Sequence, residues 1–172
     1  MRNFIFKILV AGEGGAGKTS LLRKYVDGMF DESSVMTIGV DFFTKEIEFD
    51  NSHCSLQLWD LGGQKRFRNL LDSFVMGARG ALLLFDLTKM PKIGDILEWV
   101  NIVRLHDISL PILLIGTKLD LEDLIAVDDE SALHMINVFN MMDYIKTSAK
   151  TGYNVENSFK LLAKKLTEVS NY

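Results

Sequence analysis

The sequence predicts an α/β protein built on a six-stranded, mainly parallel sheet that helices cover on both faces. Apolar runs of strand length alternate along the chain with stretches of helical period, and short connections join them. This alternation is typical of parallel strands linked by crossover helices. The 172 residues are 48% hydrophobic, which suffices for one complete core. We therefore expect a single domain over residues 1–172.

The apolar runs and the helical period place the individual elements. Strands are expected at residues 4–11, 40–49, 53–59, 80–87, 110–116 and 143–147. The polar turn Asp50-Asn51-Ser52 joins the second and third strands in a hairpin, so one antiparallel strand is expected at the edge side of the sheet. About five helices are expected, near residues 18–28, 68–76, 93–105, 129–141 and 154–169. Asn154 is the expected N-cap of the last helix.

A glycine-rich stretch follows the first expected strand and fits the pattern G-x-x-x-x-G-K-[ST] in full. Glycines let backbone N–H groups converge on phosphate oxygens, and the start of the next helix adds partial positive charge. The lysine then reaches the β- and γ-phosphates, and the threonine hydroxyl ligates Mg²⁺. A simple βα turn does not need four glycines before Lys-Thr, so the motif indicates a nucleoside phosphate site. Its expected residues are Gly12, Gly14, Gly15, Ala16, Gly17, Lys18, Thr19 and Ser20.

A second motif indicates which base is bound. Thr117-Lys118-Leu119-Asp120 follows an apolar run that reads as a buried parallel strand. A carboxylate there can accept both the N1–H and the 2-amino hydrogens of guanine, whereas adenine leaves it unpaired. Ser148-Ala149-Lys150 follows the last short strand and can supply a backbone N–H to the guanine oxygen. Together with the phosphate motif, these residues favour a guanine nucleotide.

These motifs, with Thr37 and Asp60-Leu61-Gly62-Gly63-Gln64, resemble the five ordered motifs of Ras-superfamily small GTPases. The resemblance runs from about residue 4 to about residue 170 and implies the P-loop NTPase (small G-protein) fold. Within the superfamily, the chain is most similar to Rab proteins at residues 38–42, 56–60, 66–70 and 84–88. It departs from them in the Arf-like double glycine Gly62-Gly63 and in Thr117, where Rabs carry Asn. It also lacks their paired tyrosines before Gly77.

The resemblance implies a role for each site residue. Thr19 and Thr37 ligate Mg²⁺, and Asp60 holds a water bound to that ion. The Gly63 N–H bonds the γ-phosphate, and Gln64 orients the attacking water. Phe30 packs edge-on against the guanine. Ser34 stands where many relatives have a tyrosine that covers the phosphates, which implies looser shielding. The expected catalytic residues are Gln64, Lys18 and Thr37.

The resemblance also implies the activity, a GTP/GDP molecular switch that serves vesicle trafficking or related signalling. No arginine in the chain is placed to reach the γ-phosphate, and Arg66 and Arg68 reach it only by rearrangement. Such sites hydrolyse GTP at roughly 10⁻⁴–10⁻³ per second until a GAP supplies an arginine. An exchange factor and a GAP are therefore expected partners. Thr37 and Gly63 hold their loops only while the γ-phosphate remains.

Two other function classes share the phosphate motif. A phosphotransferase or metabolic ATPase needs an arginine-rich lid for its second substrate, whereas the longest connections here surround Thr37 and Gln64. A GTP-loaded scaffold that barely hydrolyses is the third class, and Gly62 beside Gln64 leaves it open. A nucleotide-specificity assay separates the switch from the phosphotransferase. Single-turnover hydrolysis separates the switch from the scaffold.

Two aromatic residues fall on the polar face of the predicted hairpin. Alternation points Phe43, Ile47 and Phe49 inward, while Phe42 and Trp59 share the outer face with polar residues. Large aromatics on such a face often mark a binding surface. In Rab proteins the residues matching Phe42, Trp59 and Phe74 form an aromatic patch that touches effectors. The alternative is that helix 68–76 simply covers them.

Composition and charge exclude several other classes. A formal net charge of −4 argues against nucleic acid or an anionic membrane as the primary partner. The lone Cys54 excludes a disulfide framework and suits the cytoplasm. We expect a monomer. Ser170-Asn171-Tyr172 lacks the terminal cysteine of prenylated tails, so membrane attachment is expected only through a lipidated tail outside this sequence.

Overall fold

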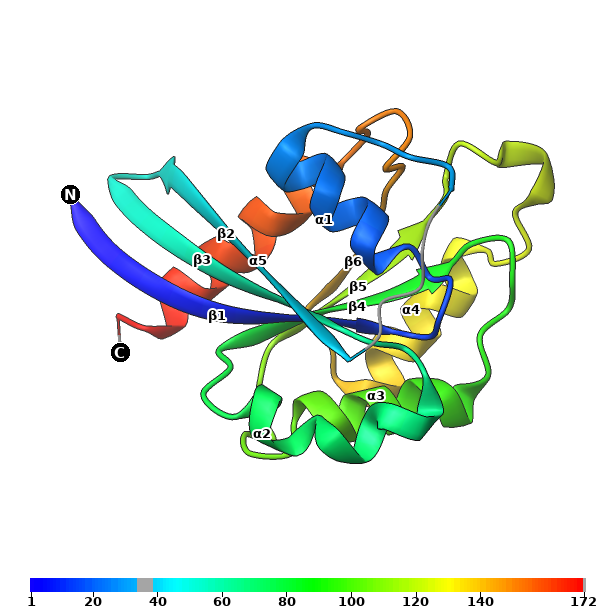
Figure 1. Cartoon of the computed structure of the whole chain (residues 1–172), viewed down its shortest axis with the longest axis horizontal. Helices are drawn as coiled ribbons and strands as arrows, with labels where there is room; N and C mark the ends of the chain where they lie inside the picture. Colours follow the sequence, from blue (N-terminus) through cyan, green and yellow to red (C-terminus); the bar gives the residue numbers. More distant parts are fainter. Residues whose placement is uncertain (34–38, 172) are drawn as a thin grey trace.

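A six-stranded sheet forms the centre of the computed structural model, which describes residues 1–33 and 39–171 (Figure 1). The strand order is β2-β3-β1-β4-β5-β6, and each neighbouring pair is parallel except β2 and β3. The predicted mainly parallel sheet with one antiparallel edge strand is confirmed. The strands are β1 (Arg2–Gly12), β2 (Val40–Phe49), β3 (Ser52–Leu61), β4 (Gly80–Asp86), β5 (Ile112–Thr117) and β6 (Asp143–Lys146).

Helices cover both faces of this sheet, as predicted, and each face has its own apolar core. Side chains of α1 (Lys18–Asp27) and α5 (Val155–Val169) pack on one face. Those of α2 (Asp72–Val75), α3 (Ile93–Val103) and α4 (Asp129–Phe139) pack on the other. All seven residues of β4 are buried, because this strand lies between the two cores. Such burial explains why β4 reads as a continuous apolar run.

The hairpin between β2 and β3 follows the predicted alternation. Asp50 and Asn51 have φ values of 45° and 59°, which make the tight two-residue turn typical of such hairpins. Cys54, Leu56 and Leu58 are fully buried, whereas Phe42 is exposed on the opposite face. Trp59 lies directly across from Phe42 in the ladder. The inward and outward faces are therefore the ones that the sequence pattern predicts.

The predicted helix at residues 68–76 is wrong in its extent. A 3₁₀ helix spans Lys65–Leu70, and α2 covers only Asp72–Val75. Its backbone bonds run over three residues, as from Phe67 N to Gln64 O and from Leu71 N to Arg68 O. The Arg68 side chain is drawn inside by carboxylates on other elements, so tertiary contacts override the helical period here.

The predicted N-cap position of α5 is confirmed, although the side chain makes a different hydrogen bond from that of a typical cap. Asn154 does occupy the N-cap position, but it has a φ of 58° and its side chain does not cap the helix. Its Nδ2 instead donates to the Lys146 carbonyl oxygen at 3.0 Å. The side chain thus ties the start of α5 to the end of β6, and this bond supports the loop between them.

The parallel strands bring the predicted motifs to one edge of the sheet. Because β1, β3, β4, β5 and β6 run in the same direction, their carboxyl ends lie together. Ligands of open α/β sheets bind at this edge. The residues that end these strands or follow them there are the glycine-rich loop, Asp60, Asp86, Thr117 and Ser148.

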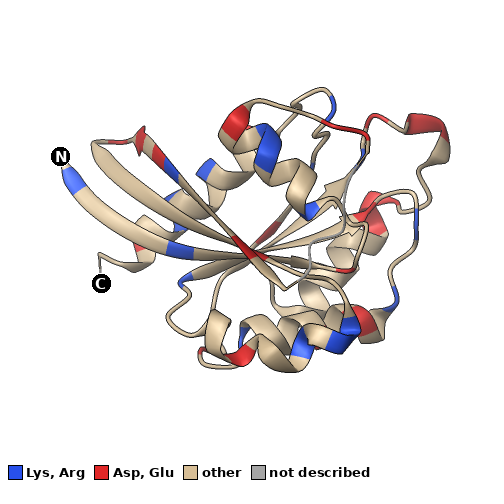
Figure 2. Cartoon of the chain, viewed as in Figure 1, with Lys and Arg blue, Asp and Glu red and all other residues tan. Residues whose placement is uncertain are grey.

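Charged side chains of both signs are interspersed over the helices and strands (Figure 2). The described helices in residues 1–33 and 39–171 include none with the length and apolar character needed to cross a bilayer.

Candidate functional site

The glycine-rich loop leads from β1 directly into α1. Gly17 stands at the N-cap with a φ of 90°, a conformation that glycine adopts without strain. Lys18 begins the helix, and its Nζ donates to the carbonyl oxygens of Gly12 at 2.7 Å and Glu13 at 2.9 Å. The loop therefore wraps around a single ammonium group, at a helix N-terminus where anions bind well.

The Lys18 ammonium is buried, with only 6% of the residue exposed. Burial lowers the pKa of Lys18 to about 8, although the charges of Asp60 and Glu13 act to raise it. A buried cation with weakened protonation gains from an anionic ligand, because the ligand restores the charge balance that water supplied. The lysine is thus arranged to receive phosphate.

A hydroxyl and a carboxylate meet beside this lysine. The Thr19 Oγ1 donates to Asp60 Oδ2 at 2.6 Å, and Asp60 is fully buried at the end of β3. Hydroxyl and carboxylate oxygens are the ligands that Mg²⁺ takes in nucleotide sites. The donor chemistry of this pair therefore fits the predicted ion. The third predicted ligand, Thr37, lies outside the described residues, as does Ser34.

A cavity of about 340 Å³ opens next to the phosphate loop. Asp120 lines it, and its Oδ1 accepts a hydrogen bond from Ser148 Oγ at 2.8 Å. The Ser148 hydroxyl also accepts a hydrogen bond from the Thr151 backbone N–H at 3.1 Å. This second bond fixes the position of the hydroxyl that orients the Asp120 carboxylate. The lining residues are Gly17, Ser20, Leu21, Phe30, Asp31, Glu32, Thr117, Lys118, Asp120, Leu121, Thr147, Ala149 and Lys150.

Thr117 and Lys118 join this cavity to the phosphate loop. Thr117 Oγ1 donates to the carbonyl oxygen of Ala16 at 2.7 Å and is also 3.1 Å from that of Phe85. Lys118 Nζ donates to the Gly15 carbonyl oxygen and to Asp86 Oδ2, both at 2.9 Å. The threonine hydroxyl thus bonds the loop directly.

Asp86 is a structural residue of the site that the sequence analysis did not single out. Burial acts to raise its pKa, but hydrogen bonds from Thr88 and Lys118 outweigh burial and hold the pKa below its usual value. The carboxylate is therefore charged and anchors the Lys118 ammonium. Its position at the end of β4, the strand beside β5, was the available signal.

Charged side chains stand at the rim of the cavity. Lys150 Nζ lies 3.2 Å from Glu32 Oε1, and both side chains are more than half exposed. Such an exposed ion pair contributes little to stability. Phe30 also lines the cavity and is 36% exposed, so its ring is accessible from the cavity side.

The segment after β3 packs directly on the phosphate loop. A Cβ added at Gly63 would collide with the Gly14 backbone nitrogen and lie 2.7 Å from the Glu13 carbonyl carbon. Only glycine fits this approach. The next residue, Gln64, accepts a hydrogen bond at its Oε1 from Arg66 Nε at 2.9 Å. The predicted water-orienting amide therefore belongs to the residue after the glycine that approaches the phosphate loop, and it is engaged by a neighbouring guanidinium.

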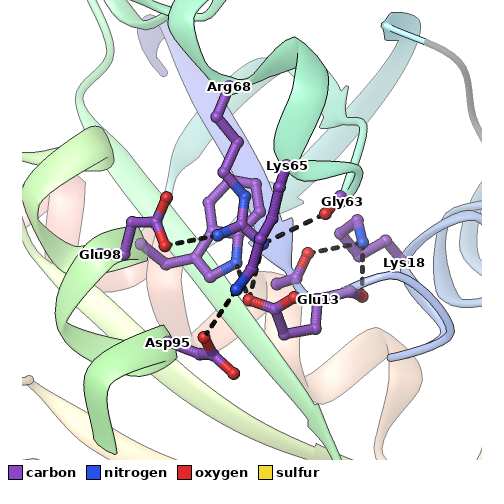
Figure 3. A network of polar contacts seen from close by, with 9 residues as sticks. Glu13, Lys18, Gly63, Lys65, Arg68, Asp95 and Glu98 are labelled. Carbon is purple, nitrogen blue, oxygen red and sulfur yellow. Dashed lines mark hydrogen bonds and ion pairs between the residues drawn. The ribbon is translucent and has the colours of Figure 1, made fainter. Parts of the chain in front are cut away.

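Arg68 lies at the centre of a charged network (Figure 3). Its side chain is 5% exposed, with Nη2 2.6 Å from Glu13 Oε1 and Nη1 2.6 Å from Glu98 Oε2. The Trp99 indole donates to the same Glu13 oxygen at 3.1 Å, and its ring lies 4.7 Å from the guanidinium carbon. The Arg68 network is these four residues, and the sequence analysis missed it. They are up to 86 positions apart, so no local pattern connects them.

The three predicted aromatics form one cluster. The Phe42 and Trp59 ring centroids are 5.0 Å apart, and those of Trp59 and Phe74 are 6.0 Å apart. Phe42 is 46% exposed and Phe74 is 37% exposed. Helix α2 therefore contributes Phe74 to the cluster rather than hiding it. Lys7 also contacts the cluster, because its Nζ lies 4.5 Å from the centroid of the Trp59 ring. The same Nζ donates to the Met76 carbonyl oxygen at 2.8 Å.

The sequence of this chain matches one family model and is similar to the sequences of several known proteins. The family model described as "Ras family" matches residues 7–168. "Ras-related protein Rab-1" of Theileria parva is 39% identical over 168 residues, which are 96% of this chain and 76% of that protein. "Ras-related protein Rab-8B" of Dictyostelium discoideum is 36% identical, over 94% of this chain and 80% of its own length. "GTP-binding protein ypt3" of Schizosaccharomyces pombe is 36% identical, over 97% and 77%.

Proposed function

This chain belongs to the Ras family, and on that premise we propose how its residues perform a Rab-like GTP/GDP switch. The chain is a small GTPase that binds GTP and GDP and hydrolyses GTP to GDP and phosphate. One observation carries the residue assignments. The phosphate loop, the pair of Thr19 with Asp60, and the cavity containing Asp120 meet at one edge of the sheet. Family membership favours a GTPase over the phosphotransferase, and single-turnover hydrolysis separates the switch from the scaffold.

The phosphate loop binds the β- and γ-phosphates. Lys18 exchanges its bonds to the Gly12 and Glu13 carbonyl oxygens for phosphate oxygens. Charge-assisted bonds of this kind are about twice as strong as neutral ones. Backbone N–H groups of the loop and of the first turn of α1, which starts at Lys18, supply the remaining donors. The contributing residues are Gly12, Gly14, Gly15, Ala16, Gly17, Lys18, Thr19 and Ser20.

The cavity next to the loop binds the guanine base. Asp120 accepts the two guanine donors with its carboxylate, which Ser148 holds in place. The Ala149 backbone N–H bonds the guanine oxygen, and Lys150 closes the rim beside it. Phe30 contacts the base edge-on. Thr117 and Lys118 fix the distance between base and phosphates, because both bond the phosphate loop.

Mg²⁺ would be held by the hydroxyls of Thr19 and Thr37 and, through a water molecule, by the carboxylate of Asp60. When bound, the ion neutralises charge on the phosphates. The Thr19 hydroxyl donates its hydrogen to Asp60, so its oxygen would ligate the ion through a lone pair. The buried Asp60 carboxylate remains close enough to Lys18 for their charges to interact, and it would orient the water molecule by accepting a hydrogen bond from it.

Hydrolysis depends on the segment after β3. The Gly63 N–H points at the γ-phosphate, and the Gln64 amide orients water for in-line attack. Gln64 must first leave Arg66, which holds its Oε1. Lys18 stabilises charge that develops on the transferred group. Thr37 would ligate Mg²⁺ only while the γ-phosphate is present. Loss of the γ-phosphate then releases both loops.

Partner binding depends on whether the γ-phosphate holds the two loops in place. The aromatic cluster of Phe42, Trp59 and Phe74 is formed by β2, β3 and α2, and it binds effectors in the GTP state. A GAP supplies the missing arginine, and an exchange factor opens the phosphate loop. The protein acts as a monomer in vesicle trafficking, in the cytoplasm and peripherally on membranes.

A nucleotide competition assay tests the base assignment. Asp120→Asn is expected to shift preference from guanosine to xanthosine nucleotides, because the amide donates where the carboxylate accepts. Each lost charged hydrogen bond costs about 1.5–3 kcal/mol of GTP binding. Asp123→Asn is the matched control, since Asp123 is exposed three residues further on and does not line the cavity. Equal affinity of the wild-type protein for ATP and GTP would contradict the assignment.

A further inference from the structure

The buried guanidinium of Arg68 connects the phosphate loop, helix α3 and the segment after β3. Arg68 contacts Glu13 of the phosphate loop, Glu98 of α3 and the Gly63 carbonyl oxygen, the last at 3.1 Å from Nη2. These partners come from three separate elements. Two carboxylates face one cation, so burial of the charge is compensated on both sides.

The network also solves a charge problem in the phosphate loop. Glu13 places a carboxylate within a loop that receives polyphosphate, and two like charges close together are unfavourable. Arg68 neutralises this carboxylate, and the Trp99 indole donates to the same oxygen. Both charges reach the phosphate-binding ammonium, because Glu13 acts to raise the pKa of Lys18 and Arg68 acts to lower it.

The same guanidinium sets the position of the catalytic segment. Gly63 has no room for a side chain against Gly14, so small movements of its backbone meet the phosphate loop at once. Arg68 bonds its carbonyl oxygen, and Gln64 is the next residue along the chain. The distance from Gln64 to the phosphate loop is therefore controlled through one peptide group.

We propose that Arg68 is a positioning residue for GTP hydrolysis, which holds Gly63 and Glu13 together so that Gln64 is presented to the γ-phosphate. This inference rests on the proposed role of Gln64. Arg68 acts through the backbone of Gly63 and through Glu13 and does not itself touch the nucleotide. The alternative is a structural role, in which the network stabilises the fold without affecting the chemical step.

Single-turnover hydrolysis of preloaded GTP, measured beside GDP dissociation, separates the two roles. Arg68→Met keeps the apolar stem and removes the charge. It is expected to slow hydrolysis by at least about tenfold, because displacement of a catalytic group by about 1 Å can cost a hundredfold. GDP dissociation reports the separate effect of leaving the Glu13 carboxylate of the phosphate loop without its cation, and the rate at which preloaded GTP is hydrolysed is read independently of it.

Two further variants sharpen the result. Arg68→Lys restores the charge but not the planar fork that reaches three partners, so hydrolysis stays slow. Lys65→Met is the matched control, because it removes the same charge from the same 3₁₀ helix. Lys65 is 70% exposed and lies 3.7 Å from Asp95, so both of its rates are expected to match wild type (Figure 3).

The outcomes are distinct. Wild-type hydrolysis in Arg68→Met, with Gln64→Leu slow, overturns the inference and leaves the proposed function intact. Wild-type hydrolysis in Gln64→Leu shows that the proposed function assigns the wrong residue, and the inference falls with it. If Arg68→Met does not fold, Glu98→Gln replaces it. Slower hydrolysis in that variant supports the inference, and an unchanged rate overturns it.

Discussion

The two ends of the nucleotide site differ in how much of their bonding is already in place. At the base end, Asp120 bonds Ser148, and Thr117 and Lys118 bond the phosphate loop, all from the ends of sheet strands. At the γ-phosphate end, the Gln64 amide bonds Arg66 on the exposed surface. The side chains at the base end are therefore already held by hydrogen bonds, whereas under the proposed function the Gln64 amide has to exchange its partner before hydrolysis. Selectivity and timing are thus assigned to different regions.

The largest effect is expected at the junction of the two ends. Lys18→Ala removes the one buried ammonium of the phosphate loop and leaves phosphate charge uncompensated. Loss of bonds to two phosphates is expected to cost at least about 3 kcal/mol, or more than about 100-fold in affinity for both GTP and GDP. Fluorescent nucleotide titration measures it. Arg23→Ala is the control, since Arg23 is an exposed cation on the same helix.

Effector binding is expected to depend on the γ-phosphate end of the site and not on the base end. Trp59→Ala removes the central ring of the aromatic cluster, and such truncations cost about 2–4 kcal/mol of affinity. A pull-down with the GTP form is expected to lose the effector while GTP binding stays intact. Leu133→Ala removes an exposed apolar side chain on α4 and serves as control. An effector that binds GDP and GTP forms equally would place the recognition surface elsewhere.

Hydrolysis and affinity are expected to separate at Gln64. Gln64→Leu removes the amide that orients water but no ground-state contact to the nucleotide. Single-turnover hydrolysis is expected to slow by about tenfold or more, whereas GTP affinity changes little. Asp120→Asn is the opposite case, with weaker binding and an unchanged rate once GTP is bound. A Gln64→Leu protein as fast as wild type would remove the distinction between the two ends.

The smallest effect is a pH dependence of binding. The pKa of Lys18 is about 8 before phosphate binds, and phosphate favours the protonated form. GDP affinity is therefore expected to be level below pH 8 and to fall by up to about tenfold per pH unit above it. Calorimetric titration between pH 7 and pH 9.5 measures the slope. Lys18→Arg stays charged and is expected to lose this slope.

The stability of the nucleotide-free protein depends on the protonation of Lys18 in the opposite direction. The pKa of Lys18 is lowered from its usual value of 10.5, so the unfolded chain binds more protons between about pH 8 and pH 10.5. Stability of the nucleotide-free protein gains a contribution from Lys18 as pH rises through that window. Bound nucleotide is expected to cancel this gain, because it keeps the lysine protonated.

Sequence patterns were sufficient wherever the relevant residues are neighbours along the chain. The loop from Gly12 to Thr19 carries its own turn geometry and helix start, so its position and chemistry follow from eight consecutive residues. Alternation in β2 and β3 likewise predicted that Phe42 and Trp59 lie on the face of the hairpin opposite Cys54, Leu56 and Leu58. The helical period failed at residues 68–76, because one charged side chain there is drawn inside by other elements.

The sequence by itself predicted which loop binds phosphate, which residue recognises guanine and which amide follows the glycine that approaches the phosphate loop. Local spacing decides these features, since each depends on residues a few positions apart. Only the tertiary structure decided that Arg68 neutralises Glu13 and Glu98, and that Asp86 anchors Lys118. The physical reason is that the pairing of buried charges depends on interatomic distances of about 3 Å, and packing across the sheet sets those distances independently of separation along the chain.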